Sequence, residues 1–150
     1  MTERLSFAAL EPGRRFVSPR RTLTETDHQL YMLLVGDWSP IHADAELARG
    51  KGARMMHGGF GVALTLGLQT AALEFADPLL AALGLDNWRF KAPLGIGDTV
   101  FVEVEILERR ITSSGDKYTV RRALRLRRSD DTLCQEGEAT ALLTLPKQPG

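Results

Sequence analysis

The sequence predicts a single α+β domain in which a curled antiparallel sheet wraps around a central apolar helix. Residues 58–75 are apolar nearly all round, and the first sixteen of them carry no charge, which is typical of a buried helix. After Gly84 the apolar residues recur at every second position, which is the period of a strand. An apolar helix and a sheet with one apolar face can bury each other when the sheet curls around the helix.

The strands of this sheet are expected at residues 99–107, 117–128 and 133–145, with a fourth near 85–90 and a further one at 14–24. Turn residues at 95–98, 113–116 and 129–131 separate them into a meander. A helix should begin after Thr24 and end at Gly36. Residues 1–12 and 146–150 are expected to be a loosely ordered lead-in and tail.

Composition and charge exclude several classes of function. The chain has 150 residues, enough for one domain with a core of its own, and its nineteen basic and nineteen acidic side chains cancel. Net charge therefore indicates no nucleic-acid partner, and no uncharged run reaches the roughly 20 residues that cross a bilayer. With one cysteine and no signal-peptide pattern, we expect a cytoplasmic protein without an internal disulfide.

The chemistry is expected in the segment Gly36-Asp37-Trp38-Ser39-Pro40-Ile41-His42. Asp37 and His42 are proton-transfer groups five residues apart, and Pro40 stiffens the link between them. Such a loop can aim a carboxylate and an imidazole at one water molecule. Because Asp37 directly follows a helix C-terminus, the helix dipole is expected to raise the pKa of its carboxyl group.

A second segment, His57-Gly58-Gly59, opens the apolar helix. Free N–H groups at a helix start can stabilise a developing oxyanion, and the small Gly58 would let a thioester oxygen reach its N–H. His57 has two interpretations: its side chain shapes the pocket, or it only caps the helix. We favour the cap.

Together these residues resemble the MaoC-like dehydratases, which include the R-specific enoyl-CoA hydratases of the hot-dog fold. The resemblance rests on Gly36-Asp37-x-x-Pro40-Ile41-His42-x-Asp44, on His57-Gly58, and on residues 90–94 followed by Gly97-Asp98. It covers residues 12–145. The family usually has Asn before the proline, where this chain has Ser39.

The resemblance implies reversible hydration of a trans-2-enoyl thioester, of CoA or of an acyl carrier, to the (R)-3-hydroxyacyl thioester without a cofactor. Asp37 and His42 would hold the water, with His42 accepting a proton and Asp37 delivering one to C2, while Gly58 binds the thioester oxygen. The remaining candidate substrate-binding residues are Ser39, Pro40, His57 and Gly59. The acyl chain would lie in a tunnel under the central helix, and the protein would be a homodimer or a higher oligomer.

Two other functions remain open: a thioesterase on the same fold, and a non-catalytic thioester-binding partner subunit. The histidines lie on different elements without metal-ligand spacing, so no metal is expected, and His28 is interpreted as a solvated helix residue. The arginines of residues 121–128 are expected on a solvated face, and those at 14–15 and 20–21 either at strand edges or near CoA phosphates.

Overall fold

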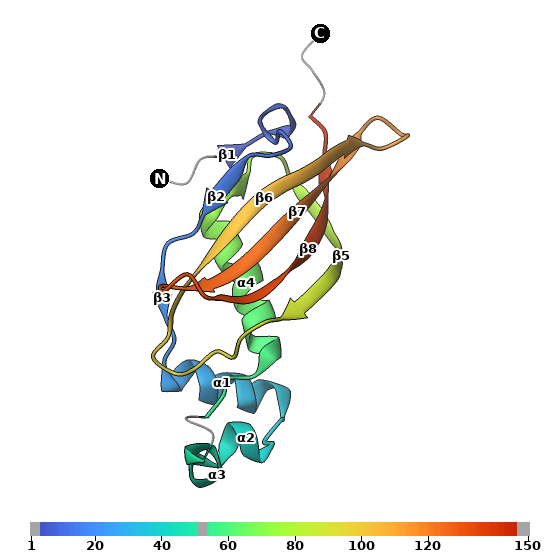
Figure 1. Ribbon diagram of the computed structural model, residues 1–150. Helices are drawn as coiled ribbons and strands as arrows, with labels where there is room; N and C mark the ends of the chain where they lie inside the picture. Colours follow the sequence, from blue (N-terminus) through green and yellow to red (C-terminus); the bar gives the residue numbers. More distant parts are fainter. Residues whose placement is uncertain (1–3, 51–53, 147–150) are drawn as a thin grey trace.

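The computed structural model describes residues 4–50 and 54–146 and contains the expected antiparallel sheet with a helix against one face (Figure 1). The sheet has six strands in the order β2-β6-β7-β8-β5, with β3 also paired to β6, and every pairing is antiparallel. Its strands are β2 (Arg15–Val17), β3 (Arg21–Thr22), β5 (Leu79–Phe90), β6 (Thr99–Ile111), β7 (Lys117–Arg128) and β8 (Leu133–Thr144). The helix against it is α4 (Gly58–Ala72).

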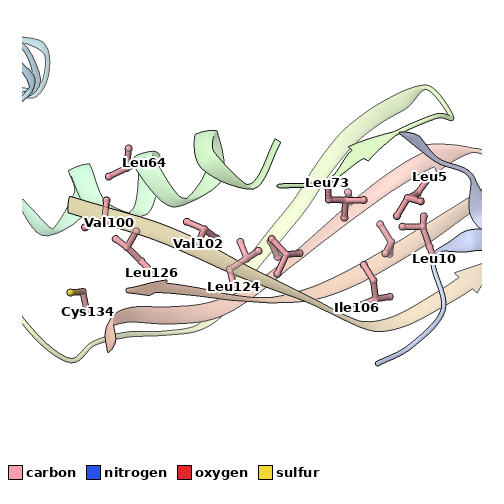
Figure 2. Close-up of a cluster of buried hydrophobic side chains, with 14 of the residues drawn as sticks. Leu5, Leu10, Leu64, Leu73, Val100, Val102, Ile106, Leu124, Leu126 and Cys134 are labelled. Atoms are coloured by element: carbon pink, nitrogen blue, oxygen red, sulfur yellow. The ribbon is translucent and has the colours of Figure 1, made fainter. Parts of the chain in front are cut away.

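The core lies between α4 and the sheet, as the alternating pattern predicts. Valines 100, 102 and 104 of β6 and leucines 124 and 126 of β7 are at most 1% exposed. Figure 2 shows several of these side chains gathered between the sheet and Leu64 of α4. Burial of each such side chain contributes about 1.5–3 kcal/mol to folding.

Residues 4–10 are packed, so the part of the expected lead-in that the structure describes is not loose. Strand β1 (Arg4–Leu5) pairs in parallel with β4 (Glu74–Phe75), and the short helix η1 (Phe7–Ala9) follows. Leu5 and Leu10 are 1% and 0% exposed. Of the tail expected at 146–150, all but residue 146 lies outside the described residues.

Three segment boundaries differ clearly from expectation, one of them the end of β6, which runs to Ile111 and not to 107. Helix α4 ends at Ala72, because residues 74–75 form a strand with β1, and β5 begins at Leu79, six residues before the expected start at 85. The strand expected at 14–24 is split into β2 and β3 around Pro19, which lacks an N–H for the ladder. Its neighbour Ser18 accepts a hydrogen bond from the Val102 N–H through Oγ instead.

Helix α4 lies close to β8 at Gly61. A Cβ there would lie 2.1 Å from Gln135 Nε2, so a larger residue would have to displace the hydrogen-bonded Gln135 side chain. A Cβ at Gly67 would meet nothing within 4 Å, because Gly67 lies on the side of the helix away from the sheet. The expectation that protein wraps the helix on most sides is therefore wrong for the single chain, in which only Gly61, Leu64 and Thr65 of α4 are fully buried.

Helix α1 (Glu25–Val35) has the predicted ends but buries an unexpected face. Thr24 and Asp27 form a capping box, and Gly36 closes the helix at φ 71°. The buried residues are His28 and Met32, whereas Leu34 is 83% exposed. His28 is thus not solvated, and the helix packs through a polar contact described below. Within the described residues, no helix is long and apolar enough to cross a membrane.

One arginine of β7 lies in the core. Its neighbours Arg121, Arg125 and Arg127 face outward and pair with glutamates of β6 and β8, as expected of a solvated face. Arg122 is 6% exposed, because strand alternation places it inward between Val120 and Leu124. The Phe75 ring, 5.2 Å away, contributes about 2 kcal/mol at such a desolvated site. Desolvating the charge costs several kcal/mol, so this contact alone does not offset burial.

Candidate active site

The segment between Asp37 and His42 is a tight turn followed by a short helix, α2 (Pro40–Ala43). Pro40 occupies the first helical position, where its missing N–H costs nothing and its fixed φ favours the helix. A second short helix, α3 (Ala45–Arg49), begins directly afterwards. Its cap is Asp44, whose Oδ1 accepts from the N–H groups of Glu46 and Leu47 at 2.9 and 3.1 Å.

Asp37 is held as a carboxylate by three donors. The Ser39 hydroxyl and amide donate to its Oδ1 at 2.5 and 3.0 Å, and His57 Nε2 donates to its Oδ2 at 2.6 Å. These bonds, that of the Ser39 hydroxyl first, lower the pKa of Asp37 to about 2. The expected rise in the pKa of Asp37 is therefore wrong, because direct hydrogen bonds outweigh the helix dipole.

His57 both caps helix α4 and lines the pocket, the two roles between which the sequence left a choice. Its Nδ1 accepts the Gly59 N–H at 3.2 Å, which caps α4. Because Nδ1 accepts, the hydrogen of the neutral ring is on Nε2, which donates to Asp37. One imidazole thus joins the start of the central helix to the carboxylate.

His42 presents a ring nitrogen, Nε2, that has no hydrogen-bond partner among the residues that the structure describes. Its Nδ1 donates to the Met55 carbonyl oxygen at 2.7 Å, which leaves Nε2 as the proton acceptor of the neutral ring. The buried His28 donates from Nε2 to the His42 carbonyl at 2.8 Å and so anchors α2 on α1. Sequence reasoning missed this contact. The i, i+4 spacing of His28 and Met32 on one face of the helix is the signal that could have revealed it.

Asp37, His42 and His57 converge in space. Each contributes a side-chain atom to a group in which all three atoms lie within 4.8 Å of one another. One water at about 2.8 Å from two such atoms spans up to about 5.6 Å, so it can contact both Asp37 and His42. The same three residues could hold a metal ion. The sequence spacing of the histidines was the reason to expect no metal, and this reason no longer holds once folding brings the three residues together.

A pocket of about 330 Å³ adjoins these groups. His42, His57 and Gly58 line it, whereas Ser39 and Gly59 do not. The pocket walls are mainly apolar and come from the residues Met55, Met56, Phe90, Ala92, Pro93 and Leu94. Asp37 and Pro40 are also absent from the lining, and the Asp37 carboxylate adjoins the pocket through its hydrogen bond with His57, which lines it.

Gly58 is oriented by a polar relay that sequence reasoning missed. Gln135 Nε2 donates to the Gly58 carbonyl at 3.1 Å, and Trp88 Nε1 donates to Gln135 Oε1 at 3.1 Å. The Gly58 N–H has no partner among the residues that the structure describes. A Cβ at Gly58 would lie 3.1 Å from the Phe90 ring, so the open space there depends on glycine. The position of Gln135, in phase with the inward Ala139 and Ala141 of β8, is the sequence signal that could have indicated this relay.

Replacing Ser39 by alanine should raise the pKa of Asp37 from about 2 toward 3.8, because the Ser39 hydroxyl is the main cause of its depression. The depressed pKa contributes stability that is present above pH 3.8 and is lost as the pH falls through 2. Carbon NMR titration of the Asp37 carboxyl would measure the shift. Ser39→Asn, which retains a side-chain donor, should restore a low value. An unchanged midpoint in Ser39→Ala would contradict this account.

Comparison with known proteins now identifies the family. The family model described as "MaoC like domain" matches residues 7–125. The chain belongs to the MaoC-like domain family. It is 30% identical over 130 residues to a mitochondrial 3-hydroxyacyl-[acyl-carrier-protein] dehydratase of Solanum lycopersicum, which covers 82% of this chain and 72% of that protein. It is also 36% identical over 100 residues to Protein MaoC of Klebsiella aerogenes, but this match spans 65% of the chain and only 29% of that protein's length.

Solved structures agree with this family. A monoamine oxidase regulatory protein from Archaeoglobus superposes with a TM-score of 0.84, at 25% identity and 97% coverage of both chains. The R-hydratase PhaJ1 of Pseudomonas aeruginosa superposes at 0.73, with 28% identity and coverage of 95% and 92%. A Mycobacterium tuberculosis protein with a double hot-dog fold, 22% identical, gives 0.85 and covers 98% of this chain and 47% of that one. The fold of this MaoC-like domain is the hot-dog fold.

Proposed function

We propose that this MaoC-like domain catalyses the reversible hydration of trans-2-enoyl thioesters to (R)-3-hydroxyacyl thioesters. The observation that carries the proposal is the free Nε2 of His42 on a mainly apolar pocket, beside a carboxylate fixed by three hydrogen bonds. The names of the hydratase and dehydratase relatives support it. An apolar pocket of this kind suits an acyl chain, and the acid–base pair suits the addition of water.

Water would be activated by His42 and oriented by Asp37. His42 Nε2 takes one proton as the water oxygen bonds to C3, and the Asp37 carboxylate accepts a hydrogen bond from the other water hydrogen. The sequence-based expectation was that Asp37 delivers a proton to C2. A carboxyl group with a pKa of about 2 is ionised at neutral pH and has no proton to give.

The proton for C2 would therefore return from His42. The imidazolium formed in the first half of the reaction gives its proton to the α-carbon, so the atoms of one water add across the double bond. Because one nitrogen both takes and returns the proton, hydrogen and hydroxyl arrive on the same face of the alkene. This route accounts for a syn addition without a second acid.

The developing enolate oxygen would be bound by the Gly58 N–H. This group lies at the positive end of α4 and is free of partners within the described residues. Gln135, by holding the Gly58 carbonyl, fixes the orientation of the same residue. One such donor typically lowers a barrier by about 3 kcal/mol.

The test is a panel of trans-2-enoyl-CoA substrates, starting with crotonyl-CoA, followed by the loss of enoyl absorbance in the ultraviolet. Hydration should occur without added cofactor and should survive treatment with EDTA, because no step uses a metal ion. Release of free CoA thiol, detected with a disulfide dye, would instead indicate the thioesterase. Absence of both signals over the whole panel would overturn the proposal.

We further propose that the chain forms a homodimer through β5. This strand ends the sheet, and its outer edge is unpaired within the described residues (Figure 1). It also exposes apolar side chains, with Leu80 at 49% and Leu83 at 54%. An exposed apolar edge strand is a template for pairing with another strand. A second copy would cover it and extend the sheet.

Replacing Leu80 by aspartate should convert the dimer to a monomer, because it places a charge on the apolar edge. Sedimentation velocity would measure the change in mass. Leu34→Asp, on the exposed face of α1, is the matched control and should leave the dimer intact. If Leu34→Asp separates the subunits and Leu80→Asp does not, the interface is on α1 and the β5 proposal is wrong.

A further inference from the structure

The group formed by Asp37, His42 and His57 also has the composition of a transition-metal site. Two imidazoles and one carboxylate are a ligand set of catalytic zinc and of non-haem iron(II), in which the protein leaves other positions of the ion open. The three ligand atoms lie within 4.8 Å of one another. Two ligand atoms of one tetrahedral zinc ion lie about 3.3 Å apart, so side-chain shifts of about 1 Å or less would bring all three into range.

Two of the three ligands are already held in the state that a metal ion requires. His42 Nδ1 donates to the Met55 carbonyl at 2.7 Å, so the lone pair of the neutral ring is on Nε2. Metal-binding histidines almost always make such a bond with the other ring nitrogen. Asp37 Oδ1 accepts two hydrogen bonds from Ser39, at 2.5 and 3.0 Å, which leaves Oδ2 for an ion. These contacts orient both side chains before any ion binds.

The third ligand must exchange a hydrogen for the ion. His57 Nε2 donates to Asp37 Oδ2 at 2.6 Å, so an ion between these two atoms replaces that hydrogen. The hydrogen of the neutral ring then moves to Nδ1, which in the structure accepts the Gly59 N–H at 3.2 Å. Because this exchange gives up the cap at Gly59, we expect a micromolar dissociation constant and not the nanomolar one of a site with three pre-set ligands.

The remaining histidine and the cysteine cannot form a competing site. The chain has three histidines and one cysteine. His28 and Cys134 are 1% and 0% exposed, and His28 Nε2 is already bonded to the His42 carbonyl. A zinc ion held by imidazoles must therefore bind to His42 and His57. Both residues line the pocket of about 330 Å³, which gives an ion a route to them.

We propose that Asp37, His42 and His57 bind one divalent transition-metal ion, with zinc as the probe, and that the bound ion stops hydration. The ion would take up the Nε2 lone pair with which His42 accepts a proton from water. It would also replace the hydrogen bond between His57 and Asp37. Magnesium, which prefers oxygen ligands, should not bind there. Binding of the ion is independent of the hydratase activity, whereas the inhibition rests on the proposed function.

The first experiment is isothermal titration calorimetry of the untagged full-length chain, freed of metal with EDTA and then exchanged into buffer. Zinc chloride and magnesium chloride are the two probes, equal in charge and different in ligand preference. Zinc should bind with one ion per chain, and magnesium should give no heat of binding. No binding of zinc at millimolar concentration, or equal affinity for the two ions, would overturn the proposal.

Variants then test the ligands. His57→Gln and His42→Asn should each weaken zinc binding at least tenfold, since losing even a hydrogen-bond partner of a metal ligand costs about 10–100-fold. Asp44→Asn is the matched control, because Asp44 lies on the same segment but caps α3 and is not one of the three ligands. It should bind zinc as the unmodified protein does, with circular dichroism checking the fold of all three variants. Unchanged zinc affinity in either histidine variant, once folded, would sink the proposal.

Nuclear magnetic resonance locates the ion in the unmodified protein. Zinc should shift the amide signal of Gly59, which loses its acceptor on His57, and that of Ser39, which donates to Asp37. The amide of Gly115, in the turn between β6 and β7, is the internal control and should not move. If zinc binds and the signals of Gly59 and Ser39 stay in place, the ion lies elsewhere and the proposal is wrong.

Kinetics test the inhibition. The rate of crotonyl-CoA hydration should fall in proportion to the fraction of chains that hold zinc by calorimetry, and EDTA should restore it. A zinc-loaded chain that hydrates as fast as the metal-free chain would overturn the inhibition. A chain that hydrates no substrate in either state would contradict the proposed function and the inhibition with it. In that case calorimetry and the variants still decide whether the metal site exists.

Discussion

His42→Ala should lower kcat for crotonyl-CoA hydration by about a thousandfold while the fold persists. The proposed route uses Nε2 of this ring twice, first as base and then as acid, and a general acid–base group typically contributes 10²–10⁴-fold. The measurement is the initial rate of absorbance loss, with circular dichroism as the check on folding. Turnover within tenfold of the unmodified protein would remove His42 from the mechanism.

His42→Asn separates proton transfer from positioning. An asparagine amide can donate to the Met55 carbonyl, as Nδ1 of His42 does at 2.7 Å, but it cannot take a proton from water. We therefore expect His42→Asn to be about as inactive as His42→Ala. If His42→Asn restores most of the rate, the ring acts only by holding the loop to Met55.

Asp37→Asn should lower kcat by about 10²–10⁴-fold, because it removes both a charge and an acceptor. Oδ1 of Asp37 accepts two hydrogen bonds from Ser39, and Oδ2 accepts one from His57. An amide has one oxygen and one nitrogen that only donates, so it cannot satisfy donors on both sides. Either the turn at Ser39 or the contact with His57 must break. Stopped-flow or steady-state hydration rates would measure the loss.

Asp44→Asn is the matched control for this substitution. Asp44 lies on the same segment and caps α3, a role in which asparagine serves about as well as aspartate. Its hydration rate should therefore stay within about twofold of the unmodified protein. If Asp44→Asn is as damaging as Asp37→Asn, the loss reflects a general disturbance of the segment and says nothing about Asp37.

Much of the fold could be predicted from the sequence, because its signals are local. Strand alternation identifies the inward valines of β6 and leucines of β7, and the cap residues Thr24 and Gly36 fix both ends of α1. The burial of Leu5 and Leu10 could not be predicted in this way. It depends on a parallel pairing of β1 with β4, about seventy residues along the chain, and short strands leave almost no periodic pattern.

The sequence predicted some residues of the candidate site, but not the hydrogen bonds between them. Asp37, His42 and His57 stand out by type and spacing, and the structure brings them together. The bond from His57 to Asp37 and the two bonds from Ser39 reverse the expected direction of the Asp37 pKa shift. These hydrogen bonds depend on which side chain reaches which oxygen of Asp37. An argument from the helix dipole alone does not include that information. Arg122 differs, because its alternation with Val120 and Leu124 along β7 already marks an inward position in the sequence.

The two hydrogen bonds of the His57 ring limit where the substrate range of this protein can be changed. One ring ties the first turn of α4 to the carboxylate, so a substitution that tilts that turn would disturb both ends at once. Phe90 and Met55 also border the pocket, yet their side chains have no part in that tie. Redesign toward longer or branched chains should therefore vary these two side chains and leave residues 57–59 untouched, which keeps selectivity and chemistry separately adjustable.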